Sequence, residues 1–295
     1  MRGWLVYNEE RLKRNVSYVR MHESWCKEHG VELRLVLVER MQYGLGPNGV
    51  WFAYDGELLD APDFAVFRCE ELDLRRLLEL GGVVVANGSR IGLIANDKLR
   101  TYELAHKLGM AYLAVFSPSL VHAEQIEYPL VVKPRRGHGG EGVRLVEDAE
   151  GLKDCLGVGA NERNGDEWLC QRVAPVVGKD LRVYVMGSKV LAAMLRSAPK
   201  GAFLSNYCRG GSACEYDLSD AEHALVAKVG HALGPGYYGI DFLFDNNGGL
   251  LLNEIEDVVG SRMLYTLTSI DVVGEHLMYV LSLCEQRDEE DALCR

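Results

Sequence analysis

A glycine-rich segment that follows a lysine is the first part of the sequence with evident chemistry. An apolar run ends at Lys133, and a second apolar run begins at Val143. Glycines let several backbone N–H groups approach one anion without interference from a Cβ atom, and a nearby lysine adds positive charge. The segment therefore predicts a phosphate-binding strand–loop–strand unit, with a glycine-rich hairpin that binds no ligand as the alternative. The loop contains four glycines: Gly137, Gly139, Gly140 and Gly142.

Three familiar phosphate-binding motifs do not fit this loop. The dinucleotide pattern Gly-x-Gly-x-x-Gly needs a helix directly after the loop, whereas here a β-like run follows and a helical pattern starts only near Ala149. A Walker loop would end in Gly-Lys-Ser/Thr, which does not follow these glycines. A protein-kinase loop would have its lysine on the strand after the glycines and a later His-Arg-Asp motif. We therefore expect a different kind of phosphate clamp.

Three carboxylates near the end of the sequence predict a metal site. Residues 237–244 and 250–256 have the pattern of a β-hairpin, with Asn-Asn-Gly-Gly in the turn. Glu254 and Glu256 are two residues apart on one strand, so they project from the same face, and Asp241 lies on the partner strand. Such hard oxygen ligands suit Mg²⁺ shared with nucleotide phosphates. A solvent-facing pair of acidic strands is the alternative.

A phosphate loop followed about a hundred residues later by such carboxylates resembles the ATP-grasp superfamily. The resemblance is closest to its ribosomal-protein-S6-modification branch, the glutamate-ligase-like carboxylate–amine ligases, and covers roughly residues 85–282. Three further segments match the family in order and at plausible spacing: Asn87-Gly-Ser89, Asn96-Asp97-Lys98, and Gly178-Lys-Asp180-Leu-Arg182.

This resemblance implies a set of ligands and site residues. It implies ATP, with one or two Mg²⁺ ions (or Mn²⁺), and an activity that joins a carboxylate to an amine through an acyl phosphate, on amino-acid or peptide substrates. The implied nucleotide contacts are Lys98, Lys133, the four loop glycines, Gln171, Val173 and Asp180; the implied metal ligands are Asp241, Glu254 and Glu256; the implied catalytic residues are Arg182, Arg196, Asn206 and Arg209.

The sequence departs from the family at the end of the metal strand. The usual Glu-x-Asn-Pro is replaced by Glu254-Ile-Glu256-Asp257, which leaves the preferred metal open. Arg262 could hold a substrate carboxylate or pair with Asp257. Three more arginines have open roles: Arg68 as a substrate contact or a surface ion pair, and Arg135 and Arg136 as phosphate contacts or solvated groups. A small-molecule kinase on the same fold and an ATP-binding regulatory module without turnover remain alternative functions.

Composition and charge narrow the class of protein. The net charge of the 295 residues is −11, which argues against nucleic-acid binding. The first apolar run is too short for a signal peptide, and none approaches membrane-spanning length. The eight cysteines lack zinc-site spacing and are expected as reduced thiols. We expect a cytoplasmic enzyme without nucleic-acid or membrane partners, for which the family resemblance allows a homodimer or a higher homo-oligomer.

The elements that position these residues predict an α/β fold of the ATP-grasp type, with two α+β subdomains that clamp the nucleotide. Strand–helix alternation in residues 1–95 predicts a parallel sheet with covered faces. Residues 96–175 are expected to form a lid with the glycine-rich loop, and residues 176–286 a core with the metal site. The last helix is expected to run from Asp271 to about Cys284, and residues 287–295 to form a frayed acidic tail.

Overall fold

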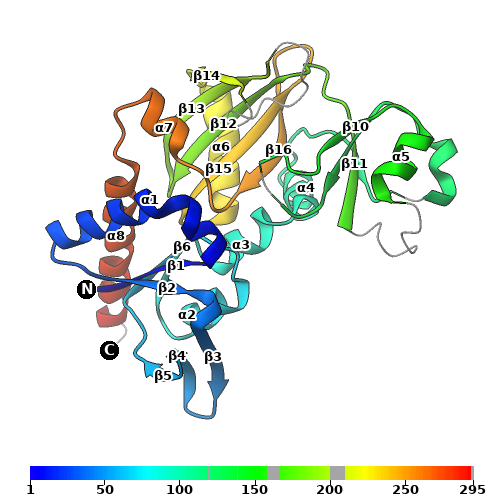
Figure 1. The fold of residues 1–295 in the computed structure, drawn as a ribbon. Coiled ribbons are helices and arrows are strands. Elements are labelled where there is room, and N and C mark those ends of the chain that lie inside the picture. Colours follow the sequence, from blue (N-terminus) through cyan, green and yellow to red (C-terminus); the bar gives the residue numbers. More distant parts are fainter. Residues whose placement is uncertain (119, 138, 158–166, 200–209, 294–295) are drawn as a thin grey trace.

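The first domain of the computed structural model is built on a parallel sheet (Figure 1). The structure describes residues 1–118, 120–137, 139–157, 167–199 and 210–293. The sheet order is β2-β1-β6-β7, with every pair parallel, which confirms the predicted parallel sheet. Its strands are β1 (Arg2–Tyr7), β2 (Glu32–Leu37), β6 (Phe64–Phe67) and β7 (Val84–Ala86).

Helices from both ends of the chain cover one face of this sheet. Helix α1 (Glu9–Glu28) and helix α8 (Val272–Leu293) share a core that includes Leu5 and Leu277. Helix α2 (Leu72–Leu80) and a small antiparallel sheet pack on the other face. This small sheet consists of β3 (Met41–Gly46), β4 (Gly49–Tyr54) and β5 (Glu57–Leu59), and the 3-10 helix η1 (Val38–Arg40) precedes it.

Helix α8 corrects the prediction for the end of the chain. The helix does not end near Cys284 but continues to Leu293, so the described part of the predicted frayed tail is helical. No glycine or proline interrupts the segment, and the Arg287 side chain donates hydrogen bonds to the carbonyls of Asp63 (3.1 Å) and Gly82 (2.9 Å). These contacts tie the last turns to the first domain.

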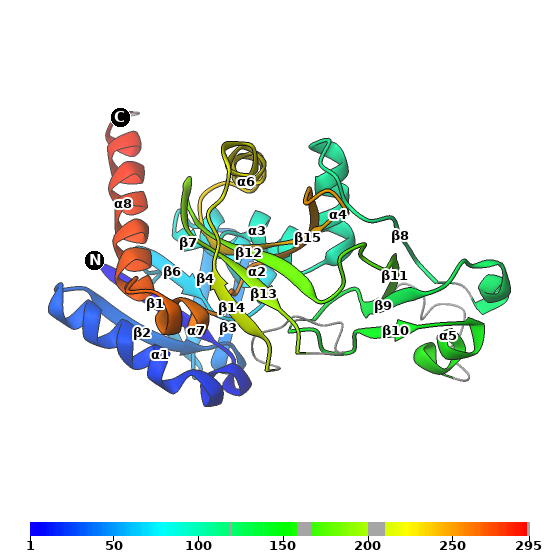
Figure 2. The same ribbon diagram turned by 90° about the horizontal axis from the view of Figure 1, so that it is seen from above.

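The lid is a second sheet, at the end of the molecule opposite helix α8 (Figure 2). Its strand order is β10-β9-β11-β8, and Leu130, Val132, Leu152 and Cys170 lie in its core. The lid contains β8 (Val115–Phe116), the 3-10 helix η2 (Leu120–Gln125), β9 (Leu130–Pro134), β10 (Arg144–Val146), α5 (Ala149–Leu156) and β11 (Trp168–Arg172).

Between the first domain and the lid stands a five-stranded antiparallel sheet of order β14-β13-β12-β15-β16. Its strands are β12 (Lys179–Met186), β13 (Lys189–Ser197), β14 (Ser212–Glu215), β15 (Tyr237–Phe244) and β16 (Leu250–Glu256). Along β12, Leu181, Val183 and Val185 pack into the core under helix α6, whereas the alternate Asp180 and Arg182 face the other side. That other face carries the candidate site.

Short helices complete the core. Helix α6 (Asp220–Leu233) begins with a capping box formed by Ser219 and Glu222. Helix α7 (Arg262–Leu267) follows β16. Helix α3 (Ser89–Ala95) precedes helix α4 (Lys98–Lys107), and Asp97 caps α4 by accepting a hydrogen bond from the Leu99 N–H. Within the described ranges, no helix is both long and apolar enough to cross a bilayer.

Candidate active site

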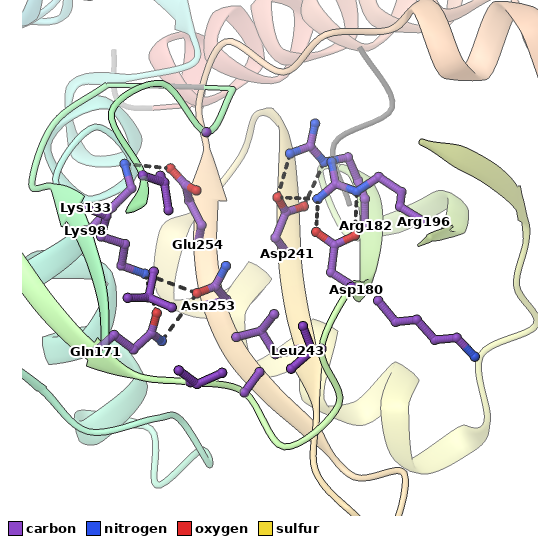
Figure 3. A pocket seen from close by; sticks show the side chains of 18 of the residues that line it. Lys98, Lys133, Gln171, Asp180, Arg182, Arg196, Asp241, Leu243, Asn253 and Glu254 are labelled. Atoms are coloured by element: carbon purple, nitrogen blue, oxygen red, sulfur yellow. Dashed lines mark hydrogen bonds and ion pairs between the residues drawn. The ribbon is translucent and has the colours of Figure 1, made fainter. Parts of the chain in front are cut away.

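A pocket between the lid and the core contains most of the predicted site residues (Figure 3). Gly142 does not line it, and Asn206 and Arg209 lie outside the described residues, so their roles stay predictions. The predicted residues that line the pocket are Lys98, Lys133, Gly137, Gly139, Gly140, Gln171, Val173, Asp180, Arg182, Arg196, Asp241, Glu254 and Glu256.

The glycine-rich loop has a backbone that only glycine adopts readily. All four predicted glycines have positive φ, from +64° at Gly139 to +117° at Gly137. At Gly142, a Cβ atom would also lie 2.7 Å from Cγ of Pro134. Gly142 therefore shapes the loop, while the other three glycines line the pocket.

Lys133 is the centre of a buried polar network on the lid side of the pocket. Its Nζ donates hydrogen bonds to Tyr102 Oη (2.7 Å), Gln171 Oε1 (2.8 Å) and Asn253 Oδ1 (3.2 Å). Burial is the main cause that lowers the pKa of Lys133 to about 7; the negative charge of Glu254 opposes this shift. An anion bound beside Lys133 would raise this pKa and favour the charged ammonium form.

Tyr102 and Asn253 were not predicted from the sequence. Tyr102 is four residues after Lys98 on helix α4, so the two side chains lie on the same helix face, and this spacing was a usable signal. Asn253 enters the pocket through a β-bulge. Asp241 pairs with Glu254 and Phe242 with Leu252, which leaves Asn253 as an extra residue in β16. The adjacent Asn253 and Glu254 therefore both line the pocket.

Lys98 connects the glycine-rich loop to the metal strand. Its Nζ lies 3.0 Å from Glu254 Oε1 and donates a hydrogen bond of 2.9 Å to the carbonyl of Gly137. Both side chains are largely buried. In Figure 3 this pair and the Lys133 network lie on one side of the pocket, Leu243 lies lower in the view, and the arginines lie on the other side.

Two arginines bridge the acidic side chains on the core side. Arg182 donates to Asp241 Oδ1 and Oδ2 at 2.7 and 2.6 Å and to Glu256 Oε1 at 2.5 Å. Arg196 donates to both Asp180 oxygens at 2.7 and 2.5 Å and to Asp241 Oδ2 at 2.8 Å. Burial alone would raise the pKa of Asp241, but the two guanidinium groups outweigh it and lower this pKa to about 2. For Glu256, burial dominates and the pKa is raised.

The three predicted metal ligands share one pocket, but cations hold them apart. Glu254 contacts Lys98, and Asp241 and Glu256 both contact Arg182. In the described part of the chain, no group of three or more acidic, histidine or cysteine side chains is close enough to hold an ion. The oxygen donors have the right chemistry for Mg²⁺. They could converge on an ion only after Arg182 and Lys98 give up these contacts.

Asp257, directly after Glu256, belongs to a different cluster. It forms a fully buried ion pair with Arg75 of the first domain (2.7 Å). Asn87 Nδ2 donates to its backbone oxygen and to Oδ1, both at 2.9 Å, and Asn96 Nδ2 donates to Oδ2 at 3.2 Å. Asn87 also donates to the carbonyl of Tyr237 (2.7 Å). The family-like asparagines thus fasten the metal strand to the first domain.

Two of the four arginines whose roles the sequence left undecided have partners inside the protein. Arg68 is buried, donates to the carbonyl of Val259 (3.1 Å) and stacks over the ring of Tyr18. It is therefore neither an open substrate contact nor a surface ion pair. Arg135 forms a two-pronged ion pair with Asp97, with both distances 2.7 Å.

The other two arginines are exposed. Arg136 lies on the lid loop. Arg262 does not pair with Asp257, because Arg75 already occupies that carboxylate. It lines a second pocket instead.

The known proteins that are similar to this chain point to one family. The model of the RimK-like ATP-grasp domain matches residues 96–280. A probable alpha-L-glutamate ligase from Maridesulfovibrio salexigens is 28% identical over 272 residues, which cover 86% of this chain and 88% of the relative. Human N-acetylaspartylglutamate synthase A is 29% identical over 290 residues, which cover 92% of this chain and 73% of the relative. The uncharacterized MG011 homolog of Mycoplasma pneumoniae is 32% identical over 180 residues, and this match spans only 60% of either chain.

Solved structures show the same fold at low sequence identity. A RimK domain ATP-grasp protein from Sphaerobacter thermophilus superposes with a TM-score of 0.66 at 19% identity, covering 95% of this chain and all of that one. D-cycloserine synthetase DcsG gives a TM-score of 0.67 at 17% identity, and the match covers 97% of this chain and 100% of that one. The predicted ATP-grasp fold is thereby confirmed. With most of its length matched by the family model, the chain belongs to the RimK-like ATP-grasp family of ATP-dependent ligases.

Proposed function

We propose that this protein is an ATP- and Mg²⁺-dependent ligase that joins a carboxylate to the amine of an amino acid or peptide through an acyl phosphate. The observation that carries the proposal is the division of the pocket. Lys98 and Lys133 lie on the lid side, Arg182 and Arg196 lie on the core side, and the acidic side chains stand between them. A polyphosphate can contact the lysines while its terminal group reaches the arginines.

The apolar residues of the pocket suit the nucleotide base. Val131, Val173 and Leu243 line it beside Gln171. The base would stack among these side chains, and the phosphates would run toward the glycine-rich loop. Lys98 is placed for a phosphate because its present contacts, Glu254 and the Gly137 carbonyl, both face the pocket.

The charges of the pocket favour an exchange of ion-pair partners when a nucleotide binds. Five acids and six bases line the pocket: the acids are Glu141, Asp180, Asp241, Glu254 and Glu256, and the bases are the four named above together with Arg172 and Lys179. Phosphate oxygens can take over the lysine and arginine contacts, which frees Asp241, Glu254 and Glu256 to hold Mg²⁺. When bound, Mg²⁺ would neutralise charge on the β- and γ-phosphate oxygens.

The reaction we derive uses the arginines for charge stabilisation. An oxygen of the substrate carboxylate attacks the γ-phosphorus, and ADP leaves. The amine nitrogen then attacks the acyl carbon, phosphate leaves, and the nitrogen releases a proton. Arg182 and Arg196 would donate hydrogen bonds to the oxyanion as its charge develops. The glycine-rich loop of the lid would exclude water from the acyl phosphate.

The test is product analysis with a pooled panel of amino acids and small peptides. We expect ADP release from Mg-ATP that depends on an amine, and a product lighter by one water than its two substrates combined, seen by mass spectrometry. A stable phosphorylated acid without condensation would contradict the ligase and favour a kinase. ATP binding without turnover under every condition would favour a regulatory module.

A further inference from the structure

A second pocket opens where the first domain, the core and the lid loop meet. We call it the junction pocket and define it by Arg11, Glu71, Tyr184, Glu256, Gly260 and Arg262. Arg11 comes from helix α1, and Glu71 from the loop before helix α2. The two glycines Gly137 and Gly139 of the lid loop also reach it. The junction pocket thus adds helix α1 and the loop before helix α2 to parts of the chain that also line the pocket between the lid and the core, which we call the nucleotide pocket.

The junction pocket is continuous with the nucleotide pocket. Arg182, Arg196 and Glu256 line both. Along β12, Asp180 lines the nucleotide pocket, Arg182 lines both, and Tyr184 lines the junction pocket, as alternation along a strand requires. If ATP occupies the first pocket with its terminal phosphate near Arg182, a second reactant can reach that phosphate from the junction pocket.

Most charges in the junction pocket are already paired within the protein. Arg11 lies 2.5 Å from Glu70, and Arg14 lies 2.9 Å from Glu10. Within the described residues, the side chains of Glu71 and Arg262 form no hydrogen bond or ion pair. One uncompensated anion from the first domain and one uncompensated cation from the core therefore face the same pocket.

The surroundings of Glu71 favour a positively charged partner. Its carboxyl is half-buried, and burial raises its pKa, as do the nearby charges of Asp73 and Glu39; Arg75 opposes them. A carboxylate that is partly desolvated among like charges is stabilised by a cation that binds beside it. A substrate ammonium group can supply this charge.

We propose that the junction pocket binds the acid substrate as a zwitterion, an amino acid or short peptide whose ammonium group pairs with Glu71 and whose carboxylate faces Arg182, Arg196 and Arg262. This inference rests on the proposed ligase activity and adds to it the chemical class of the acid. Glu71 would set specificity without contacting the reacting atoms. An acid with a blocked amino group would leave Glu71 unpaired.

The test uses hydroxylamine as a surrogate amine, so that the acyl phosphate is captured as a hydroxamate without knowledge of the natural amine. The probes are free amino acids and dipeptides, each beside its N-acetyl counterpart. We expect hydroxamate and ADP from unblocked acids. The Glu71→Gln variant should raise KM for the acid roughly 10- to 100-fold, as expected for a lost hydrogen bond to a charged group, with KM for ATP unchanged.

Two further variants keep the result interpretable. Glu71→Asp retains the charge and should recover part of the affinity for the acid, which a purely structural role of Glu71 would not predict. Asp60→Asn is the matched control, because Asp60 is an exposed carboxylate of the first domain that lies 3.6 Å from Arg2 and does not line the pocket; its KM values should not change.

The outcomes separate the two proposals. Hydroxamate formation from N-acetylated acids at least as efficient as from free ones, or an unchanged KM in Glu71→Gln, would overturn the zwitterion proposal while leaving the ligase intact. Absence of both ADP and hydroxamate with every acid would overturn the ligase itself, and the zwitterion proposal with it.

Discussion

Glu256 and Asp257 are neighbours in the sequence with opposite surroundings. Glu256 faces the pocket and contacts Arg182, and its side chain is 15% exposed. Asp257 is fully buried and contacts Arg75, Asn87 and Asn96. A carboxylate that a ligand can reach is able to exchange its cation, whereas one sealed between two domains cannot. The same chemical group therefore serves binding at one position and assembly at the next.

Breaking the buried pair should give the largest effect. We expect Asp257→Ala to lower the free energy of unfolding by about 3–5 kcal/mol, because the Arg75 charge would remain buried without a partner. Chemical denaturation monitored by fluorescence measures this loss. In an Asp257→Leu/Arg75→Met double variant, no charge is left unpaired, and a large part of the stability should return. A single variant with near-wild-type stability would contradict the assigned role.

Removing the charge of a pocket residue should affect turnover rather than stability. We expect Glu254→Gln or Lys133→Ala to lower kcat by at least about 10²–10³-fold, the usual scale for a lost electrostatic contact to the transition state. The free energy of unfolding should change much less than in Asp257→Ala. Steady-state ADP release gives kcat, and chemical denaturation of the same samples gives the free energy of unfolding. Near-normal turnover in either variant would rule out the site assignment.

Two buried histidines near Arg68 should make stability depend on pH. Burial lowers the pKa of His22 to about 4 and that of His276 to about 3. The unfolded chain takes up these protons near pH 6.5, so stability is full above that pH and falls as the pH drops toward 4. Each histidine adds a slope of at most about 1.4 kcal/mol per pH unit.

Unfolding curves between pH 7.5 and 5 measure this slope. The His22→Gln variant should flatten it, since glutamine does not titrate. An unchanged slope would show that other groups control the acid sensitivity.

The smallest effect should come from the ion pair between the lid and helix α4. Arg135 is 27% exposed, so its pair with Asp97 is partly hydrated. We expect Arg135→Ala to lower the free energy of unfolding by no more than about 1 kcal/mol. Arg136→Ala, on the adjacent exposed residue, is the control. A loss comparable to that of Asp257→Ala would remove the distinction between reachable and sealed ion pairs.

Local patterns explain what could be predicted from the sequence. The strand–helix alternation of the first domain and the Tyr237–Glu256 hairpin follow from the period of their apolar residues, and the structure has both. The convergence of Asp180, Arg182 and Asp241 in one pocket agrees with the family resemblance. These features depend on residues close in sequence or on motifs with known order.

Features that depend on distant partners escaped the prediction. The pairing of Asp257 with Arg75 joins residues 182 positions apart. The continuation of helix α8 depends on contacts of Arg287 with two loops of the first domain. In a regular strand, Asn253 would lie on the face opposite Glu254, and only the register of both strands shows that it reaches the pocket. Spacing within one segment contains none of this information.

The bulge at Asn253 also affects how this protein can change over evolutionary time. Substitutions along β16 alter one contact at a time, but the loss of a single codon there would remove the extra residue and restore the regular pairing. The pairs Asp241–Glu254 and Phe242–Leu252 would survive, but the pocket would lose Asn253, which accepts hydrogen bonds from Lys133 and Tyr102. Length variation should therefore be far rarer in this strand than in the exposed turn at residues 245–249.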